Sequence, residues 1–393
     1  LAQNYPNNKV NMKDQHRRVT YRHKPGFLER VGNSCMGVLV GICVFLISII
    51  LLYYNEGRSV AVAIMLEEGL NNVASLEMSS KWQFNGKLVH HIGLLEAEND
   101  IQDDYYKIKL PCVKLKRTVE MYQWIEHSQS KETNVGDKIE TETTYTYDLE
   151  WSSTLSQSRN FAEEIGHTNP RFLFQDSTTH SLEYVTSQGI KLSGTLIDKI
   201  NWFKTIHNLP VPEHSSKATI HKHYFYHGGD PLYPEVGDTR TSFQCAGVTR
   251  ETNHVGKRDV VSIVAMLKDD KFTTYSSNNG HSIAFLYRGS VSAEQIFRSE
   301  ESSNSTLTWA LRFIGMILMY VGLSIMTNII TTLVDWIPVV RQIVAFSVAS
   351  FNMTLTLFLS LLVIAFGWLR FRPLFATTLA AASLLPWLIS SKR

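Results

Sequence analysis

Long stretches without a charged side chain are the most informative feature of this sequence, and they are unevenly placed. One lies near the start of the chain and three lie close together near its end. They predict transmembrane helices at residues 31–55, 309–334 (free of charge from residue 313 onward), 342–369 and 373–391. A helix rises about 1.5 Å per residue and a hydrocarbon core is about 30 Å thick, so about 20 apolar residues are needed to cross it. The pattern therefore predicts an α-helical membrane protein with four spans.

Residues 56–308, between the first two spans, have the composition of a globular domain. From residue 139 to 151, the side chains at 141, 143, 145, 147, 149 and 151 (Thr, Thr, Tyr, Tyr, Leu and Trp) alternate with Glu, Thr and Asp, which is the period of a strand with one aromatic face turned inward and one acidic face outward. Residues 113–125 alternate in the same way, and Gly136-Asp137 between the two suits a hairpin. Further strands are predicted at 87–95, 219–226, 240–247, 260–267, 272–275 and 283–287, and helices at 58–76 and 194–203. The domain is predicted to be α+β with strands dominant.

Charge predicts how these parts face the membrane. The basic segment 1–30 has seven Lys and Arg against two acidic residues, whereas residues 56–308 have 25 basic and 33 acidic residues, a net charge of −8. Basic flanks stay on the cytoplasmic side, so residues 1–30 are expected in the cytosol or nucleoplasm and the large domain in a lumen. The short hairpin link 335–341 and the end 392–393 then return to the cytosolic side. Arg370 and Arg372 fit this less well, which leaves a re-entrant hairpin of the last two spans as an alternative.

Candidate chemistry in the lumenal domain is sparse. The sequence has no phosphate-binding glycine loop, nucleophile elbow, HExxH or paired CxxC motif. The histidines that come closest to a metal site are His214, His221, His223 and His227. Two of them, His221 and His223, would share one face of a strand, but exposed histidines or pH sensing are alternatives. No metal, cofactor, nucleic acid or small-molecule substrate is expected, the basic segment is interpreted as a topogenic or lipid-contacting flank, and a lumenal enzyme is the weakest reading.

Cysteines leave one question open. Cys35 and Cys43 lie beside or inside the first span, so Cys112 and Cys245 are the only candidates for a lumenal disulfide. Both lie in strand-like sequence, and both a bridge and two buried thiols agree with the pattern.

Polar residues inside the spans are the candidate functional residues. Uncharged polar side chains in hydrocarbon seek partners on neighbouring helices, and glycines permit close approach. Candidates for helix contacts or for the lining of a pore are Gly315, Gly322, Thr327, Asn328, Thr331, Thr332, Asn352 and Thr354. Candidates for the membrane interface are Trp309, Trp336 and Arg341. No ionisable residue lies deep in a predicted span, which disfavours an active transporter.

Short blocks of sequence along nearly the whole chain resemble one known family. They read PGFLER at 25–30, NEGR at 55–58, EMYQW at 120–124, EIGHTNP at 164–170, FYH at 225–227, YPEVGDTRTSF at 233–243, TLVDWIP at 332–338, and GWL followed by RPL at 367–374. In this order they resemble the LUMA family, the four-span inner nuclear membrane proteins also called transmembrane protein forty-three. Of the four histidines, only His227 lies in a matched block, and Cys112 falls where no family cysteine is expected.

The resemblance implies a protein of the inner nuclear membrane and endoplasmic reticulum, with the plasma membrane as a further location. It implies a non-enzymatic scaffold that self-associates in the lipid bilayer, contacts emerin and lamins, and maintains the structure of the nuclear envelope. The alternative function is an oligomeric cation channel or a modulator of gap-junction conductance and signalling, with Asn328 and the neighbouring threonines facing a wet pore.

Overall fold

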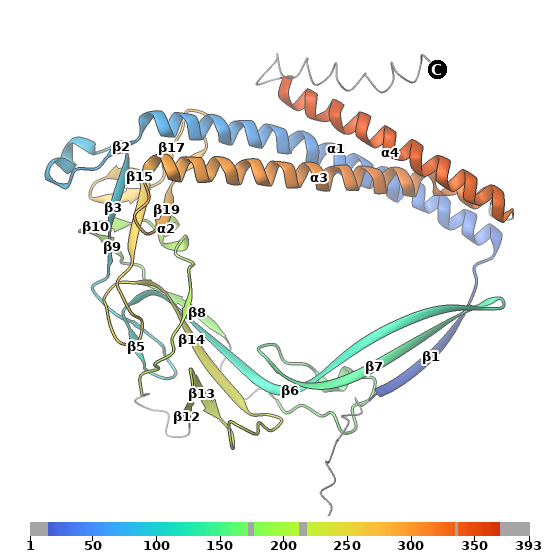
Figure 1. Cartoon of the computed structure of the whole chain (residues 1–393), viewed down its shortest axis with the longest axis horizontal. Coiled ribbons are helices and arrows are strands. Elements are labelled where there is room, and N and C mark those ends of the chain that lie inside the picture. The colour runs from blue at the N-terminus through green and yellow to red at the C-terminus, as the bar shows by residue number, and fades with distance from the viewer. Residues whose placement is uncertain (1–14, 172–176, 212–217, 335–336, 370–393) are drawn as a thin grey trace, which may run out of the picture.

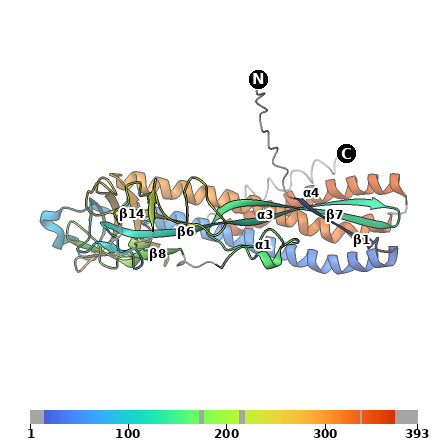
Figure 2. The ribbon, with the colours of Figure 1, turned by 90° about the horizontal axis from the view of Figure 1, so that it is seen from below.

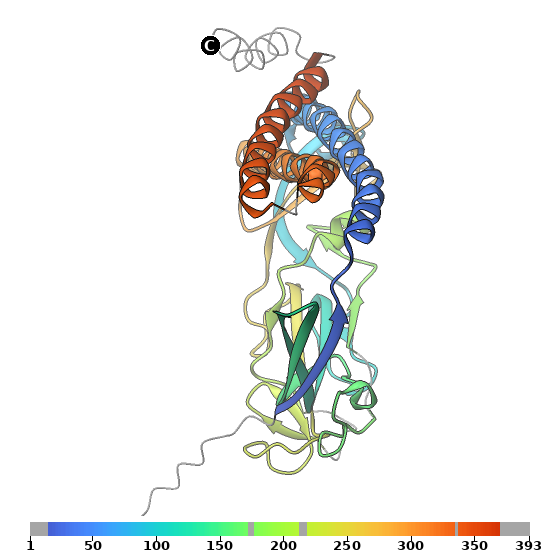
Figure 3. The same ribbon diagram turned by 90° about the vertical axis from the view of Figure 1, so that its right-hand side faces the viewer.

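The computed structural model describes residues 15–171, 177–211, 218–334 and 337–369. Three long helices lie along one side of an elongated molecule, and a strand-rich domain joins them at one end (Figure 1). Seen from the end of the molecule, the helices form a separate group above the sheets (Figure 3). The predicted strand-dominated domain is therefore confirmed.

The helices are α1 (Phe27–Asn72), α3 (Ala293–Leu333) and α4 (Pro338–Leu369), with a short α2 (Gly194–Asp198) inside the domain. All three long helices extend beyond the apolar stretches that predict them. A helix does not need apolar side chains to continue, so hydropathy marks only its apolar part. Ser292 caps α3, since its hydroxyl accepts a hydrogen bond from the backbone N–H of Gln295 at 3.3 Å and the Gln295 side chain accepts one in return. Pro338 begins α4, where its missing N–H is not needed.

The prediction of four spans is wrong. In the part of the chain that the structure describes, three helical segments are long and apolar enough to cross a membrane, at Ser34–Asn72, Ala293–Leu333 and Val339–Trp368. The segment 373–391, predicted as the fourth, lies outside the described residues. Hydropathy marks an apolar stretch and does not establish that it crosses, so we describe a protein with three candidate spans.

The domain is built from two large sheets. The first has the order β1-β7-β6-β14-β13-β12, with β8 on β6 and β11 on β14. Its strands are β1 (Gln15–His23), β6 (Cys112–Val135), β7 (Lys138–Ser152), β8 (Thr178–Ser181), β11 (Lys204–Thr205), β12 (Thr219–His221), β13 (Tyr224–His227) and β14 (Thr239–Val248). The second has the order β19-β15-β16-β10-β9-β3-β2, with β15 also on β3. Its strands are β2 (Ala74–Ser75), β3 (Leu88–Glu96), β9 (Thr186–Ser187), β10 (Ile190–Leu192), β15 (Val260–Lys268), β16 (Lys271–Thr273) and β19 (Phe285–Arg288).

Smaller elements complete the domain. Two further pairs of short strands are β4 (Ile101–Gln102) with β5 (Lys109–Leu110), and β17 (Tyr275–Ser276) with β18 (Ser282–Ile283). Two 3₁₀ helices lie at Met78–Phe84 and Ser158–Asn160. The predicted strand 219–226 is interrupted, because Lys222 has a positive φ of 55° in the turn between β12 and β13. His221 and His223 therefore do not share a strand face, which corrects that prediction.

Apolar side chains from both sheets fill the core. Fully buried members include Val113 of the first sheet and Val89, Ile263 and Phe272 of the second. A neighbouring cluster surrounds Phe225 and Phe243. There Cys112 and Cys245, with Cα atoms 6.0 Å apart, form a disulfide between β6 and β14. The sequence agrees with either a disulfide or two buried thiols at Cys112 and Cys245. The structure has the disulfide, and it joins two strands that are already neighbours in the sheet.

The domain is fixed to the helices by a third apolar cluster. Met65 and Leu66 from the C-terminal part of α1 and Ile296 and Phe297 from the first turns of α3 pack with Phe285 of β19. Burying an apolar side chain of this size contributes about 2 kcal/mol. The two helices therefore enter the domain as one packed pair.

The hairpin of β6 and β7 is the most extended part of the domain. Fifteen residue pairs join the two strands from Met121↔Ser152 to Val135↔Lys138, around the predicted turn at Gly136-Asp137. It runs alongside the helices toward the N-terminal end of α1 (Figures 1 and 2). There β1 adds to its edge, from Gln15↔Thr146 to His23↔Lys138, and the backbone N–H of Lys24 donates to Asp137 at 2.9 Å.

The pairing of β1 with β7 sets a condition on the predicted orientation. If α1 crosses a bilayer, residues 15–23 and the hairpin lie on opposite sides of it, and the two strands cannot pair. The predicted orientation, with residues 1–30 on the opposite side of the membrane from the large domain, and the pairing of β1 with β7 therefore cannot both hold at the same time. The orientation remains a prediction, and the pairing offers a direct way to test it.

Candidate functional site

Two glycines set the distance between α1 and α3. A Cβ atom added at Gly322 would lie 2.8 Å from the backbone nitrogen of Phe45, and one added at Gly41 would lie 2.8 Å from the carbonyl oxygen of Gly322. Nearer the domain, a Cβ at Gly315 would lie 2.6 Å from the Cδ2 atom of Leu52. The two antiparallel backbones are therefore in contact, as in membrane helix pairs that associate through small residues.

A charged cluster closes the domain-side end of the apolar helices. We call Glu56 of α1, Arg312 of α3 and Trp368 of α4 the Glu56 cluster. The Arg312 guanidinium donates from Nε at 2.6 Å and from its second nitrogen at 2.7 Å to the two carboxylate oxygens of Glu56. The indole N–H of Trp368 donates to the same carboxylate. Glu56 is 0 % exposed, so one carboxylate joins three helices without contact with water.

Further polar side chains surround this cluster on the domain side. Asn55 donates to the carbonyl oxygen of Thr308 at 3.1 Å. Arg58 donates to the Asn304 side chain at 3.0 Å and to the Thr308 hydroxyl at 3.1 Å. Hydrogen bonds of this kind between neighbouring helices are typical of polar residues that must be satisfied away from water. They fix α1 and α3 in register just beyond the apolar segment.

A second polar layer closes the opposite end. The hydroxyl oxygens of Ser34 on α1 and Thr332 on α3 are 3.0 Å apart, and Thr332 also donates to the carbonyl oxygen of Asn328 at 3.0 Å. The Thr331 hydroxyl donates to the same carbonyl at 2.8 Å and to the Asn328 side chain at 3.1 Å. Ser34 and Glu56 are 22 positions apart, which corresponds to about 33 Å of helix, close to the thickness of a hydrocarbon core.

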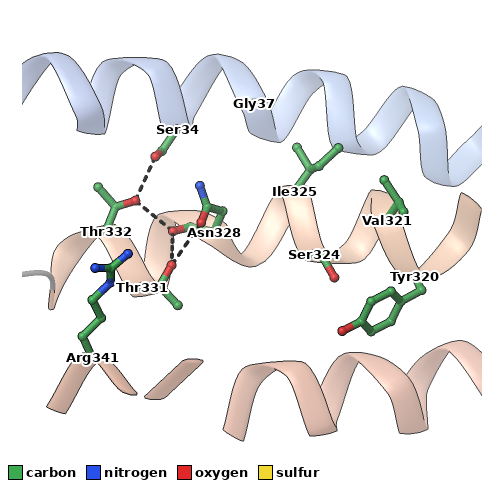
Figure 4. Close-up of a pocket in the computed structure, with 10 residues that line it drawn as sticks. All are labelled: Ser34, Gly37, Tyr320, Val321, Ser324, Ile325, Asn328, Thr331, Thr332 and Arg341. Atoms are coloured by element: carbon green, nitrogen blue, oxygen red, sulfur yellow. Dashed lines mark hydrogen bonds between the residues drawn. The ribbon is translucent and has the colours of Figure 1, made fainter. Parts of the chain in front are cut away.

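This second layer surrounds a cavity of about 600 Å³, which we call the Asn328 cavity. All three helices line it, through Ser34, Gly37, Tyr320, Val321, Ser324, Ile325, Asn328, Thr331, Thr332 and Arg341. Figure 4 shows Arg341 pointing from α4 toward α3, and the hydroxyls of Tyr320, Ser324 and Thr331 on the α4 side of α3. The predicted candidates Asn328, Thr331, Thr332 and Arg341 thus meet at one place.

The remaining predicted residues lie elsewhere on the bundle. Asn352, 1 % exposed, donates to the Thr327 hydroxyl at 2.8 Å and links α4 to α3. Thr354 is exposed and donates to the backbone of its own helix. Trp309 is 64 % exposed and lies against Arg312, with the guanidinium carbon 4.7 Å from the ring centre. Trp336 lies outside the described residues.

Buried ionisable groups of the domain serve its packing. The ring of His91 contacts Phe272 and bonds to the Ser187 hydroxyl at 3.1 Å, and burial, with His90 nearby, lowers the pKa of His91 to about 4. The Tyr106 hydroxyl lies 2.9 Å from Nε2 of His227, where burial raises the pKa of Tyr106 to about 12 and lowers that of His227. These groups stay neutral near pH 7.

The alternative of a metal site at the four histidines is not supported by their positions in the described part of the chain. His214 lies outside the described residues, and His223 packs against His207 with ring centres 5.6 Å apart. Within the described ranges, one other group has ligand atoms within 4.8 Å of one another: His127, Asp148 and Glu150. Its histidine and glutamate are exposed, and exposed groups of this kind are common without an ion, so we assign no metal to it.

Sequence reasoning missed three residues of the bundle. Glu56, Arg312 and Gly41 lie at or inside the ends of the apolar stretches and look like ordinary flanks when each is read alone. For Glu56 and Arg312 the sequence did contain a signal, because an acidic residue ends the first apolar stretch and a basic residue begins the second on the domain side. Because neighbouring spans in antiparallel order bring these ends together, an acid on one and a base on the other predict a pair.

The fold defines a membrane protein in which a bundle of three candidate spans carries a strand-rich domain. Comparison with known proteins is more specific. A sequence profile described as Transmembrane protein 43 matches residues 121–373. Transmembrane protein 43 from Mus musculus is 39 % identical over 395 residues, covering 100 % of this chain and 98 % of the mouse protein.

The same relation extends to other animals. Transmembrane protein 43 from Homo sapiens is 38 % identical with the same coverage, and the homolog from Drosophila melanogaster is 30 % identical over 359 residues, 89 % of this chain and 92 % of that protein. No solved structure matches. This chain belongs to the transmembrane protein 43 family.

Proposed function

We propose that this chain is a non-enzymatic membrane scaffold that self-associates and organises protein complexes. The proposal rests on the hydrogen-bond partners of the polar residues in the spans. Asn352, Thr327, Ser34 and Thr332 bond to helices of the same chain. Among the described residues, these polar side chains thus find their partners within one chain, and the remaining surface of the three helices is available for lipid and for other membrane helices.

That remaining surface is strongly apolar. Large exposed side chains cover the outward faces of α1 and α4, among them Met36, Leu39, Ile47, Phe346, Phe351 and Met353. In membranes, helix association depends on packing between such faces rather than on removal from water. We propose that copies of the chain meet through the α4 face around Phe346 and Phe351.

The setting that we propose for the scaffold rests on the family resemblance. We propose the inner nuclear membrane and endoplasmic reticulum as its location, with emerin and lamins among its partners. The bundle would supply the membrane contacts of such complexes. Reconstitution of the full chain with emerin tests this part, and an absence of binding in bilayers would contradict it.

Self-association tests the scaffold directly. The full chain, labelled at one site and reconstituted at low density, should show more than one label per particle in photobleaching. Replacing Phe346 and Phe351 with Ala should reduce that fraction, because it removes two side chains that are 77 % and 62 % exposed. Leu307→Ala, which removes an exposed side chain nearer the domain, is the control and should have no effect.

Ion conduction is the rival function and predicts a different result. A conducting pore needs the Asn328 side chain and its neighbours in water, whereas the Thr327 and Thr332 hydroxyls donate to carbonyls of their own helix. We expect liposomes containing the full chain to show no ion flux above empty liposomes. Flux that changes with Asn328→Leu would contradict the scaffold as the whole function.

A further inference from the structure

A second cavity, of about 590 Å³, lies in the strand-rich domain, and we call it the His223 cavity. Four parts of the chain form its walls: residues 204–208, His223 in the turn between β12 and β13, Cys245 and Val248 of β14, and the loop 253–256. A volume of this size is in the range of ordinary ligand sites. The cavity is therefore large enough for a small molecule.

Hydrogen bonds hold these walls in place. The side-chain amide of Asn208 donates to the carbonyl oxygen of Asn253 at 3.3 Å, and the carbonyl oxygen of Asn208 accepts from Nδ1 of His254 at 2.5 Å. Lys204 pairs with Cys245 between β11 and β14, and the disulfide at Cys245 adds β6. The walls are thus tied to one another and to the sheet, so the cavity is a formed site.

The lining of the cavity is basic. None of its twelve described lining residues is acidic, whereas four can carry a positive charge: Lys204, His207, His223 and His254. Among the described residues, the Lys204 ammonium and the ring nitrogens of His207 and His223 have no hydrogen-bond or ion-pair partner. Unused donors of this kind, without a competing carboxylate, favour an anion.

The charges around His223 have the same sign. Burial lowers the pKa of His223, and the nearby positive groups of His207, Arg240 and Lys222 lower it further. The Glu120 carboxylate does not offset them, because it is already bonded to Arg240 at 2.7 Å. An anion in the cavity would relieve this repulsion and raise the pKa of His223.

Apolar side chains form the remaining part of the lining. Ile206 and Val248 are buried in the cluster around the Cys112–Cys245 disulfide, and Val255 packs against the same cluster. Inorganic phosphate or sulfate would leave this part of the cavity unused. An anion attached to a short apolar body matches both parts at once.

We propose that the His223 cavity binds a small organic oxyanion, in which a charged oxygen group is attached to a short apolar body. The oxygen group lies among Lys204, His207 and His223, and the apolar body lies against Ile206 and Val248. This proposal does not depend on the scaffold function.

Isothermal titration calorimetry of the full chain in a non-ionic detergent tests the proposal. Butanesulfonate is the probe, because its charge does not change with pH, and inorganic sulfate is the same kind of anion without the apolar body. We expect butanesulfonate to bind at least about fivefold more tightly than sulfate, since its methylene groups become buried. Equal affinity for the two would overturn the proposal.

A pair of lysine variants tests the charged part of the site. Lys204→Gln should weaken the binding of butanesulfonate roughly tenfold, because a charge-assisted contact is lost. Lys271→Gln, which removes an exposed lysine of β16 outside the cavity, is the matched control and should bind as the original chain does. The same affinity in Lys204→Gln as in the original chain would overturn the proposal.

The pH dependence gives a readout that does not rely on Lys204. Protonation of His207, His223 and His254 adds positive charge beside Lys204, Lys222 and Arg240, so butanesulfonate should bind more tightly at about pH 6 than at about pH 8. The double variant His207→Gln with His223→Gln should show a smaller difference, whereas His23→Gln should keep the difference of the original chain. Binding that is independent of pH in the original chain, or an unchanged difference in the double variant, would overturn the assignment.

Discussion

Arg312 donates two hydrogen bonds, at 2.6 and 2.7 Å, to the carboxylate of Glu56, a residue 256 positions earlier in the chain. Both side chains are largely shielded from water, at 12 % and 0 % exposure. The pair lies where the apolar segments of α1 and α3 end, and Trp368 adds α4 to it. The three helices are therefore joined at a point where loss of either charged partner leaves an unpaired buried charge.

Removing the base should destabilise the bundle more than removing both charges. Arg312→Ala leaves the Glu56 carboxylate buried without its partner, which we expect to cost about 3 kcal/mol or more in unfolding free energy. The double variant Glu56→Leu with Arg312→Met should be less destabilised than Arg312→Ala. Thermal unfolding of the full chain in detergent measures both, and an Arg312→Ala variant as stable as the original would contradict the role of the pair.

Close contact at Gly322 gives a second prediction. An alanine there would press its Cβ against the backbone of α1, which cannot move aside as a side chain can. Gly322→Ala should therefore lower the unfolding temperature of the bundle. Gly57→Ala on α1 is the matched control, because no atom lies within 4 Å of its added Cβ, and it should be neutral or slightly stabilising.

Acid should weaken the domain through His91. Its folded-state pKa of about 4 lies below the ordinary value of 6.5, so the unfolded chain binds a proton more readily between these values. The stability that neutral His91 contributes is complete above about pH 6.5 and is lost as the pH falls through about 4, a difference of up to about 3 kcal/mol.

Denaturant unfolding of the full chain at a series of pH values checks this dependence. His91→Gln should show a smaller decrease in unfolding free energy between pH 7 and pH 4 than the original chain. His23→Gln, which removes an exposed histidine of β1, should leave the dependence unchanged. An equal decrease in all three proteins would assign the acid sensitivity to other groups.

The pairing of β1 with β7 allows the orientation to be tested. Arg18 and Thr143 lie directly opposite each other, so cysteines at both positions should form a disulfide when the strands pair. With Cys35 and Cys43 replaced by Ala, we expect this cross-link in detergent and not in sealed membranes. A cross-link in sealed membranes would place residues 15–23 on the side of the domain and contradict the predicted orientation.

Local patterns allowed some of this architecture to be predicted. The hairpin of β6 and β7 was predictable because alternation with a period of two and a two-residue turn are both properties of neighbouring residues. The apolar helices were predictable for the same reason, from their uninterrupted hydrophobic sequence. The strand predicted at 219–226 failed at Lys222, since one residue with a positive φ is enough to turn the chain and composition does not reveal it.

Contacts between distant residues were not predictable in this way. Gly41 meets Gly322, and Glu56 meets Arg312, only because α1 and α3 pair in antiparallel order with a particular register. No single stretch of sequence contains that register. The count of spans failed for a related reason, because hydrophobicity alone does not say whether a final apolar segment crosses the membrane. Of the candidate site, the polar residues could be identified but not the neighbours they bind.

The central claim is that α1, α3 and α4 of one chain form the bundle, with Ser34 of α1 against Thr332 of α3. Cysteines at these two positions, in a chain with Cys35 and Cys43 replaced by Ala, place sulfur atoms where hydroxyl oxygens are 3.0 Å apart. Mild oxidation in native membranes should cross-link them within one chain, seen as a monomer with a shifted mobility that reduction reverses. A cross-link that forms only between chains, or none at all, would contradict the account.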